Sequence, residues 1–355
     1  MILSVAAVLV GLIILVWAAD RFVLGAAALA RNWGVSTLVI GLTIVAFGTS
    51  APELLVSAMA ALNGNRGLGI GNAIGSNIAN IGLVIGVTAL LSPLTVHSAV
   101  LRREIPALFA IIILVFFLMY DYELSRNDGI LLILALVLLI VITVRLGLNS
   151  RGRDPLVAEL VKDAPPPMSN LRATMWFLVG LVALLISARV LVWGAVDIAK
   201  ALGVSDVVIG LTIVAIGTSL PELAATLVSA LKNEHDLAIG NIIGSNMFNL
   251  LGVMAMPGLI SPGTFGPVVM ARDYALMFAI SLFLMWMCYG FRGRGKVSRL
   301  EGGLLLAVYC GYMVFLYFDH TGDVANGSEP VGHAGAMSPW YGEPAPGPDF
   351  SPRSS

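Results

Sequence analysis

Long apolar runs, interrupted by charged or turn-forming residues, extend from the first residues of the chain to about residue 318. A helix of about 20 residues crosses the roughly 30 Å hydrocarbon core of a bilayer, whereas strands of a membrane barrel alternate over about 10 residues. The runs have the helical length. The pattern therefore predicts an all-α membrane protein with ten transmembrane helices, at residues 2–19, 36–62, 69–92, 104–120, 129–147, 173–195, 205–231, 238–260, 273–291 and 302–318.

The composition supports a membrane protein and excludes several other classes. Of 355 residues, 58% are hydrophobic and 12% are charged, against about 45–50% and about 25% in soluble domains. A cytosolic enzyme, a secreted disulfide scaffold and a disordered chain do not fit these values. The net charge of -1 gives no field that would attract nucleic acid. We expect the lipid bilayer as a partner and no nucleic acid, and the sequence identifies no protein partner.

The spans fall into two groups of five, residues 1–147 and residues 173–318, joined by a polar linker at 148–172. Residues 319–355 are rich in Gly, Pro and Ser, and we expect a disordered external tail there. Fourteen of the 20 Lys and Arg residues lie on one side of the predicted helices. The positive-inside rule makes this side cytoplasmic. Both termini would then lie outside an inner, or plasma, membrane, and the linker would lie inside the cell.

The chain repeats itself at a fixed offset, which maps position 39 onto position 208. Residues 39–54 match residues 208–223 at 14 of 16 positions, and residues 69–80 match residues 238–249 at 8 of 12, without a gap between the two blocks. Because each half has an odd number of spans, the second half enters the membrane upside down. This predicts an inverted-topology repeat, an architecture of many secondary transporters, with the two copies of the motif meeting near the midplane.

Each repeat carries a glutamate in mid-span, Glu53 in the first and Glu222 in the second. A carboxylate at the bilayer centre is costly, by about 2.5–3.5 kcal/mol on insertion scales, and neither block contains a Lys or Arg to neutralise it. The sensible partner is a cation that binds and leaves. Pro52 and Pro221 precede the glutamates and remove a helical N–H, so we expect broken helices with freed carbonyl oxygens.

Further oxygen-bearing side chains recur at helical spacing around both glutamates. They are Thr49, Ser50 and Ser57, then Asn72, Ser76 and Asn80, and in the second half Thr218, Ser219 and Thr226, then Asn241, Ser245 and Asn249. The absence of His and Cys from both blocks argues against Zn²⁺ and Cu⁺. Two carboxylates can neutralise one Ca²⁺ or two Na⁺. The residues thus indicate a carrier or antiporter for hard cations, Ca²⁺ favoured, with no cofactor and no enzymatic activity.

These blocks resemble the α-repeats of the sodium/calcium exchanger family, on the strength of GTSAPE at 48–53 with GNAIGSNIAN at 71–80, and GTSLPE at 217–222 with GNIIGSNMFN at 240–249. The resemblance implies two inverted five-helix halves and exchange of Na⁺ for Ca²⁺ by alternating access. It fits a prokaryotic type, because the chain lacks the large cytoplasmic Ca²⁺-sensing insert of animal exchangers, and its 148–172 linker has too few acidic residues for such a domain. It implies ion ligands at Glu53, Glu222, Thr49, Thr218, Ser50, Ser219, Ser76, Ser245, Asn80 and Asn249, with the carbonyls of Ala46 and Ala215.

Several alternatives stay open at this point. The rival transport reaction is H⁺/Ca²⁺ antiport, since Glu53 and Glu222 could carry protons, and exchange of another hard cation is a related possibility. A passive cation channel and an intramembrane hydrolase, with Ser50 as nucleophile and Glu53 as base, belong to other classes. Potassium-dependent members of the family carry Asp at the position of Asn249, so the resemblance argues against K⁺ co-transport and leaves the number of Na⁺ sites open.

Overall fold

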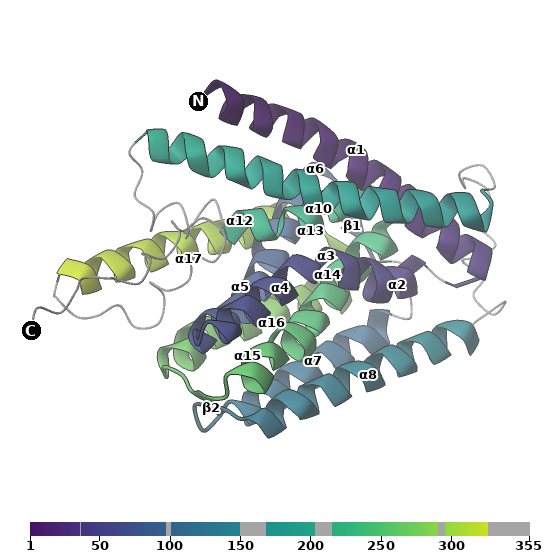
Figure 1. Ribbon diagram of the computed structural model, residues 1–355. Coiled ribbons are helices and arrows are strands. Elements are labelled where there is room, and N and C mark those ends of the chain that lie inside the picture. Colours follow the sequence, from purple (N-terminus) through teal and green to yellow (C-terminus); the bar gives the residue numbers. More distant parts are fainter. Residues whose placement is uncertain (36, 97–100, 150–167, 203–214, 290–294, 326–355) are drawn as a thin grey trace, which may run out of the picture.

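The computed structural model describes residues 1–35, 37–96, 101–149, 168–202, 215–289 and 295–325, and it is predominantly helical (Figure 1). In the first half the elements are α1 (Ile2–Trp33), α2 (Thr37–Ile40), the π-helix η1 (Gly41–Val45), α3 (Ala46–Thr49), α4 (Ala51–Leu62), α5 (Arg66–Ala79), the π-helix η2 (Asn80–Ile85), α6 (Gly86–Leu91), β1 (Leu94–Thr95), α7 (Leu101–Leu118), β2 (Glu123–Leu124) and α8 (Arg126–Asn149). In the second half they are α10 (Asn170–Ala201), α12 (Ala215–Thr218), α13 (Leu220–Leu231), α14 (His235–Phe248), the π-helix η4 (Asn249–Val253), α15 (Ala255–Ile260), β3 (Gly263–Thr264), the π-helix η5 (Val269–Tyr274), α16 (Ala275–Tyr289), β4 (Lys296–Val297) and α17 (Arg299–Ala325).

Within the described residues, seven helices are long and apolar enough to cross a membrane. An eighth span results if the bent pair Leu38–Thr49 and Ala51–Leu62 is counted as one. α7 covers most of the predicted span 104–120, and part of the predicted span 205–231 falls outside the described residues. Large apolar side chains are exposed on the outer helices, as expected for surfaces in contact with lipid. The helical membrane fold is thus confirmed.

Several predicted boundaries were wrong. α1 continues to Trp33 rather than ending at residue 19, because its second half buries small residues against neighbouring helices. α17 continues to Ala325, so the tail predicted from residue 319 begins as helix; the chain has no proline there to end it. α8 and α10 likewise extend two or three residues into the predicted linker. The remainder of the predicted linker and tail, 150–167 and 326–355, lies outside the described residues.

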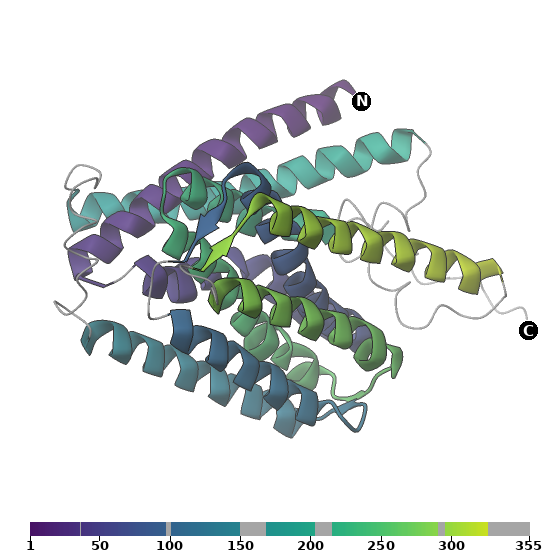
Figure 2. The ribbon, with the colours of Figure 1, turned by 180° about the vertical axis from the view of Figure 1, so that it is seen from behind.

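Helices α1 and α10 lie side by side across one face of the molecule, in both views (Figures 1 and 2). Their close approach depends on glycines. A Cβ added at Gly25 would lie 2.4 Å from the backbone nitrogen of Phe177, and one added at Gly194 would lie 3.0 Å from Cγ2 of Val8. Gly25 and Gly194 occupy equivalent positions of the sequence repeat, as do Val8 and Phe177. The two helices therefore cross through equivalent positions of the two halves.

Within the described residues, four strands of two residues each depart from the all-helical prediction. β1 pairs antiparallel with β4, in the register Leu94 to Val297, and β2 pairs antiparallel with β3, in the register Leu124 to Gly263. The β1–β4 pair is visible in Figure 2. Each pair joins a strand of one half to a strand of the other, and β1 and β3 occupy equivalent positions of the repeat. The equivalent strands β1 and β3 thus each pair with a strand of the opposite half.

The buried apolar residues form two main clusters. The larger cluster is built mainly from α5 to α8 and α14 to α17 with their π-helical segments, together with Ala230 of α13, and we call it the core. The second cluster is built mainly from α1 and α10, and it reaches the core helices through Ala225 of α13 and Leu237 of α14. The α1/α10 pair is therefore a separate packing unit laid against the core.

Candidate ion-binding site

The helix that carries Glu53 is broken immediately before it. α3 and α4 are separated by Ser50, whose backbone (φ −85°, ψ 8°) leaves the helical range, and the segments Leu38–Thr49 and Ala51–Leu62 bend by 44°. Pro52 lies in the first turn of α4, where its missing N–H costs nothing. Glu53 also lies in this turn, where the helix dipole favours negative charge. The predicted break is confirmed.

The second half repeats this break. α12 ends at Thr218, Ser219 has nearly the same backbone angles (φ −89°, ψ 4°), and Glu222 lies in the first turn of α13. Ala215 begins α12, and its side chain lies outside the described residues. In the first half the carbonyl of Ala46 accepts the Ser50 N–H at 3.0 Å and faces the Thr49 hydroxyl at 3.4 Å. Both breaks place a glutamate at a helix N-terminus.

The two breaks meet inside the protein. Glu53 and Glu222 are each 1% exposed. The Ser50 hydroxyl donates to Oε1 of Glu222 at 3.0 Å, and the Thr49 hydroxyl donates to Oδ1 of Asn241 at 3.3 Å. Both hydrogen bonds run from the first half to the second. Polar side chains of the two repeats therefore form one buried cluster.

Many polar atoms of this cluster have no hydrogen-bond partner among the described residues. They are Oε2 of Glu53 and of Glu222, Oγ of Ser219 and of Ser245, Oδ1 of Asn80, and both amide atoms of Asn249. An unsatisfied buried polar group costs about 1–3 kcal/mol, so such groups are few in folded proteins. Here they gather at residues that the sequence singled out. A bound cation would satisfy the oxygens.

Asn80 and Asn249 occupy equivalent positions at the start of the π-helices η2 and η4. π-helical turns are rare and frequently mark functional sites. The Asn80 amide donates to Oδ1 of Asn246 at 3.1 Å, and the Asn77 amide donates to the Asn246 carbonyl at 3.2 Å. Asn77 and Asn246 thus join α5 to α14. Asn77 and Asn246 do not lie on the helical faces formed by Asn72, Ser76 and Asn80 and by Asn241, Ser245 and Asn249. Their contacts agree with a role in joining the two helices.

Sequence reasoning placed Asn72 and Asn241 on the same helical face as the predicted ligands but did not assign them a role. The Asn72 amide donates to the Ser57 hydroxyl at 3.0 Å and to the Glu53 carbonyl at 2.9 Å. The Asn241 amide donates to the Thr226 hydroxyl at 3.0 Å, the equivalent contact of the second half. Because the amide nitrogens are used in this way, the orientation of both side chains is fixed.

Ser76 of α5 and Ser245 of α14, two further predicted ligands, lie one helical turn beyond Asn72 and Asn241. Both are buried, at 5% and 0% exposure. Thr218 is half-buried at the end of α12. Within the part of the chain that the structure describes, no group of three or more His, Cys, Asp or Glu side chains could hold a metal. A cation here would be bound by two carboxylates with hydroxyl, amide and carbonyl oxygens, which are hard ligands.

Comparison with known proteins decides the family. The profile described as sodium/calcium exchanger protein matches residues 3–145 and 172–318, which is most of the chain. The chain belongs to the sodium/calcium exchanger family. This is a family of transporters. Each of the two matched segments contains one copy of the repeated motif.

Several similar proteins align with this chain over nearly their whole length. CaxA of Alkalimonas amylolytica is 47% identical, over 89% of this chain and 99% of its own. The inner membrane protein YrbG of Escherichia coli is 39% identical, over 90% and 98%, and the sodium/calcium exchanger MaX1 of Methanosarcina acetivorans is 32% identical, over 87% and 97%. Among solved structures, the sodium-calcium exchanger NCX_Mj soaked with Na⁺ and Ca²⁺ matches with a TM-score of 0.76 at 36% identity, over 88% of this chain and 98% of its own.

Proposed function

We propose that the chain is a secondary active antiporter that exchanges Na⁺ for Ca²⁺ across a membrane by alternating access. The observation that carries the proposal is the buried cluster shared by the two halves, in which Ser50 of one repeat holds Glu222 of the other at 3.0 Å. Membership of the exchanger family and the similarity to a sodium-calcium exchanger soaked with both ions support it. Two carboxylates balance the charge of one Ca²⁺ or of two Na⁺, so the ions can replace each other.

The proposed ligands are the residues of this cluster. Glu53 and Glu222 supply the charge, and each has an unpartnered oxygen among the described residues. Neutral oxygens complete the six to eight that Ca²⁺ takes, from Thr49, Thr218, Ser50, Ser219, Ser76, Ser245, Asn80, Asn249 and the carbonyls of Ala46 and Ala215. Asn72 and Asn241 support the site through the hydroxyls of Ser57 and Thr226.

The proposed architecture is two inverted five-helix repeats, residues 1–147 and 173–318, with ten transmembrane helices in all. The reciprocal pairing of β1 with β4 and of β2 with β3, and the equivalent glycine contacts between α1 and α10, are what a two-fold axis in the membrane plane would produce. Such an axis brings the two broken helices to the same depth. A site there can be reached from either side in turn.

The proposed location is an inner, or plasma, membrane, with both termini outside and the 148–172 linker in the cytoplasm. The Lys and Arg distribution supports this orientation, and similarity to an inner membrane protein of Escherichia coli supports the location. In this orientation α13 ends at the cytoplasmic face and α4 ends at the outer face.

The main alternative is H⁺/Ca²⁺ antiport through protonation of Glu53 and Glu222. The two reactions are separated by loading sealed vesicles with Ca²⁺ and imposing Na⁺, K⁺ and H⁺ gradients one at a time while radioactive Ca²⁺ flux is measured. We expect the Na⁺ gradient to drive Ca²⁺ flux, with the pH gradient alone ineffective. Ca²⁺ flux that is driven by the pH gradient and insensitive to Na⁺ would contradict Na⁺/Ca²⁺ exchange and support H⁺/Ca²⁺ antiport. Flux that needs no counter-ion would indicate a channel.

A further inference from the structure

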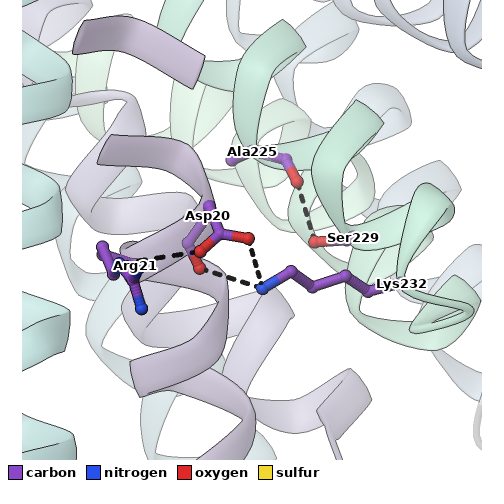
Figure 3. Close-up of polar contacts among 5 residues, drawn as sticks. All are labelled: Asp20, Arg21, Ala225, Ser229 and Lys232. Atoms are coloured by element: carbon purple, nitrogen blue, oxygen red, sulfur yellow. Dashed lines mark hydrogen bonds and ion pairs between the residues drawn. The ribbon is translucent and has the colours of Figure 1, made fainter. Parts of the chain in front are cut away.

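An ion pair connects the α1/α10 unit to the core. The ammonium group of Lys232, which caps the C-terminus of α13, lies 2.8 Å from Oδ1 of Asp20 on α1 and donates to the Asp20 carbonyl at 3.2 Å (Figure 3). Arg21 lies on the far side of the same carboxylate, at 3.7 Å, and its guanidinium also stacks on the ring of Trp176 in α10. Asp20 is therefore held between its own packing unit and the end of a core helix.

Lys232 ends α13, a helix that packs against α14 and contributes Ala230 to the core and Ala225 to the second cluster. It ends the helix that begins beside Glu222, and its backbone closes the last turn of α13 with bonds to Val228 and Ser229. A cation at this end is favoured by the helix dipole. Burial, and then the nearby Asp236, raise the pKa of Glu234 at the N-cap of α14, and the charge of Lys232 opposes this rise, so Lys232 also lies near Glu234. Lys232 thus stays in a favourable position at the end of α13 when α1 moves away.

The residues at the equivalent positions of the repeat cannot form this ion pair. The repeat maps Asp20 onto Arg189 of α10 and Lys232 onto Asn63, which caps α4 at the opposite face as Lys232 caps α13. Asn63 is neutral, so it cannot pair with a charge as Lys232 does. The helix ends correspond in backbone, but the charge on them differs. The two helix ends that the repeat relates therefore differ in charge.

We propose that the Asp20–Lys232 ion pair is a one-sided latch that holds α1 against α13 and biases the exchanger toward the state in which this face is closed. The inference rests on the proposed alternating-access function. In an inverted-repeat carrier one unit moves against the other, so a contact that closes one face must open when that face gives access to the site. The pair that the repeat relates to Asp20 and Lys232, Arg189 and Asn63, cannot form the same ion pair, because Asn63 is neutral.

The latch is expected to bias the equilibrium moderately. The Asp20 and Lys232 side chains are 39% and 31% exposed, and partly exposed ion pairs are weakened by water and salt. We therefore expect its loss to raise the population of the state open at this face by about two- to fivefold. A bias of this size leaves both states populated, as a transport cycle requires.

The experiment measures the separation of the two units directly. Spin labels are placed on cysteines introduced at Val16 of α1 and Leu91 of α6, both exposed, with Cys288 and Cys310 replaced by serine. Ser92, next to Leu91, donates to the Ala230 carbonyl near the end of α13, so the second label reports on the core beside Lys232. Distances between the labels are recorded by pulsed electron paramagnetic resonance on the full chain in lipid nanodiscs.

The variants are Asp20→Asn, Lys232→Gln and the reversed pair D20K/K232D. We expect each single change to increase the longer-distance population by about two- to fivefold and the reversed pair to restore the original distribution. The matched control is Arg145→Gln, which removes an exposed positive charge from α8, a helix that carries neither member of the ion pair. We expect no shift from it.

A salt titration tests the latch without substitution. In the labelled chain with Asp20 and Lys232 intact, a salt of non-transported ions, N-methylglucamine chloride, should produce the same shift as the single variants by screening the pair. Unchanged distances in the single variants and at high salt would overturn the latch, as would a reversed pair that behaves like either single variant. Failure of Na⁺-driven Ca²⁺ flux in the unsubstituted chain would instead overturn the proposed function, so the two failures are distinguishable.

Discussion

The two halves of the chain agree closely around the buried cluster and differ at the ends of their helices. The Asn72 amide reaches Ser57 as the Asn241 amide reaches Thr226, each at 3.0 Å. At the helix ends, however, the first half has Asp20 and Asn63 where the second has Arg189 and Lys232. Under the proposed alternating-access function, the ion site would serve both access states and would have to be complete in each. The helix ends contribute to one state at a time, and their charges can differ without damaging the site.

The hydrogen bonds of the cluster show a second, smaller difference between the halves. Ser50 donates to Glu222, but within the described residues the equivalent Ser219 hydroxyl has no partner. Glu222 therefore accepts a hydrogen bond from a serine of the other half, and Glu53 does not accept the equivalent bond from Ser219. Substitutions made in matching pairs, one in each half, measure how far the two repeats are functionally equivalent.

The largest effect should come from the glutamates, and it should be equal in both halves. We expect Glu53→Gln and Glu222→Gln each to reduce Ca²⁺ flux to background while leaving the fold intact. Removing one partner of a buried charge pair costs about 3–5 kcal/mol, which corresponds to about 100-fold or more in affinity. The measurement is Na⁺-driven Ca²⁺ flux in vesicles, with the fold checked by thermal unfolding.

The matched control for this pair is Glu123→Gln, the same change at an exposed position of β2. It should leave flux unchanged. Full flux in either cluster variant would contradict the shared midplane site. Loss of flux in only one of the two would show that the repeats contribute unequally to it.

A smaller and unequal effect is expected for the two serines. We expect Ser50→Ala to weaken apparent Ca²⁺ affinity by about tenfold or more, because a hydrogen bond to a charged group contributes about 1.5–3 kcal/mol. Ser219→Ala should weaken it less, because its hydroxyl has no protein partner within the described residues. The measurement is the Ca²⁺ concentration for half-maximal flux, and equal effects would show that the Ser50–Glu222 bond does not distinguish the halves.

The sequence alone predicted the parts of the structure that depend on local chemistry. The repeat located the two glutamates, and Pro52 placed the break in the helix close to Ser50, where it occurs. The sequence could not predict the features that depend on how the two halves pack against each other. The Ser50 to Glu222 hydrogen bond joins residues 172 positions apart, and a sequence pattern within one helix does not report the rotation of its neighbour.

The remaining misses have the same origin. The two-residue strands β1 to β4 form only where loops of different halves meet. They are too short to show the alternation of apolar and polar residues by which a strand is predicted. The charged residues Asp20 and Arg21 suggested the end of an apolar run, yet α1 continues because Gly25 and the alanines after it pack against other helices. Tertiary contacts overrode the local pattern there.

An added carboxylate should change the ion dependence of exchange. Asn249 has both amide atoms unpartnered within the described part of the chain, at the start of η4. We expect Asn249→Asp to change the Na⁺ or K⁺ concentration for half-maximal flux by about tenfold, a free-energy change of about 1.4 kcal/mol. Asn65→Asp is the control, because aspartate caps α5 as well as asparagine does. Unchanged ion dependence in Asn249→Asp would place this residue outside the ion path.

The smallest effect should come from giving the opposite face a charge pair of its own. Asn63→Asp places a carboxylate at the end of α4, where Arg189 of α10 is the pseudo-symmetric counterpart of Asp20. Stabilising closure of that face should favour opening of the Lys232 face, so the longer Val16–Leu91 distance should gain population by about twofold, in the same direction as Asp20→Asn. In an Arg189→Gln background the effect of Asn63→Asp should disappear. A shift that persists there, or one of opposite sign, would mean that charge at the end of α4 acts on some other contact and that the two faces are not alternatives of one equilibrium.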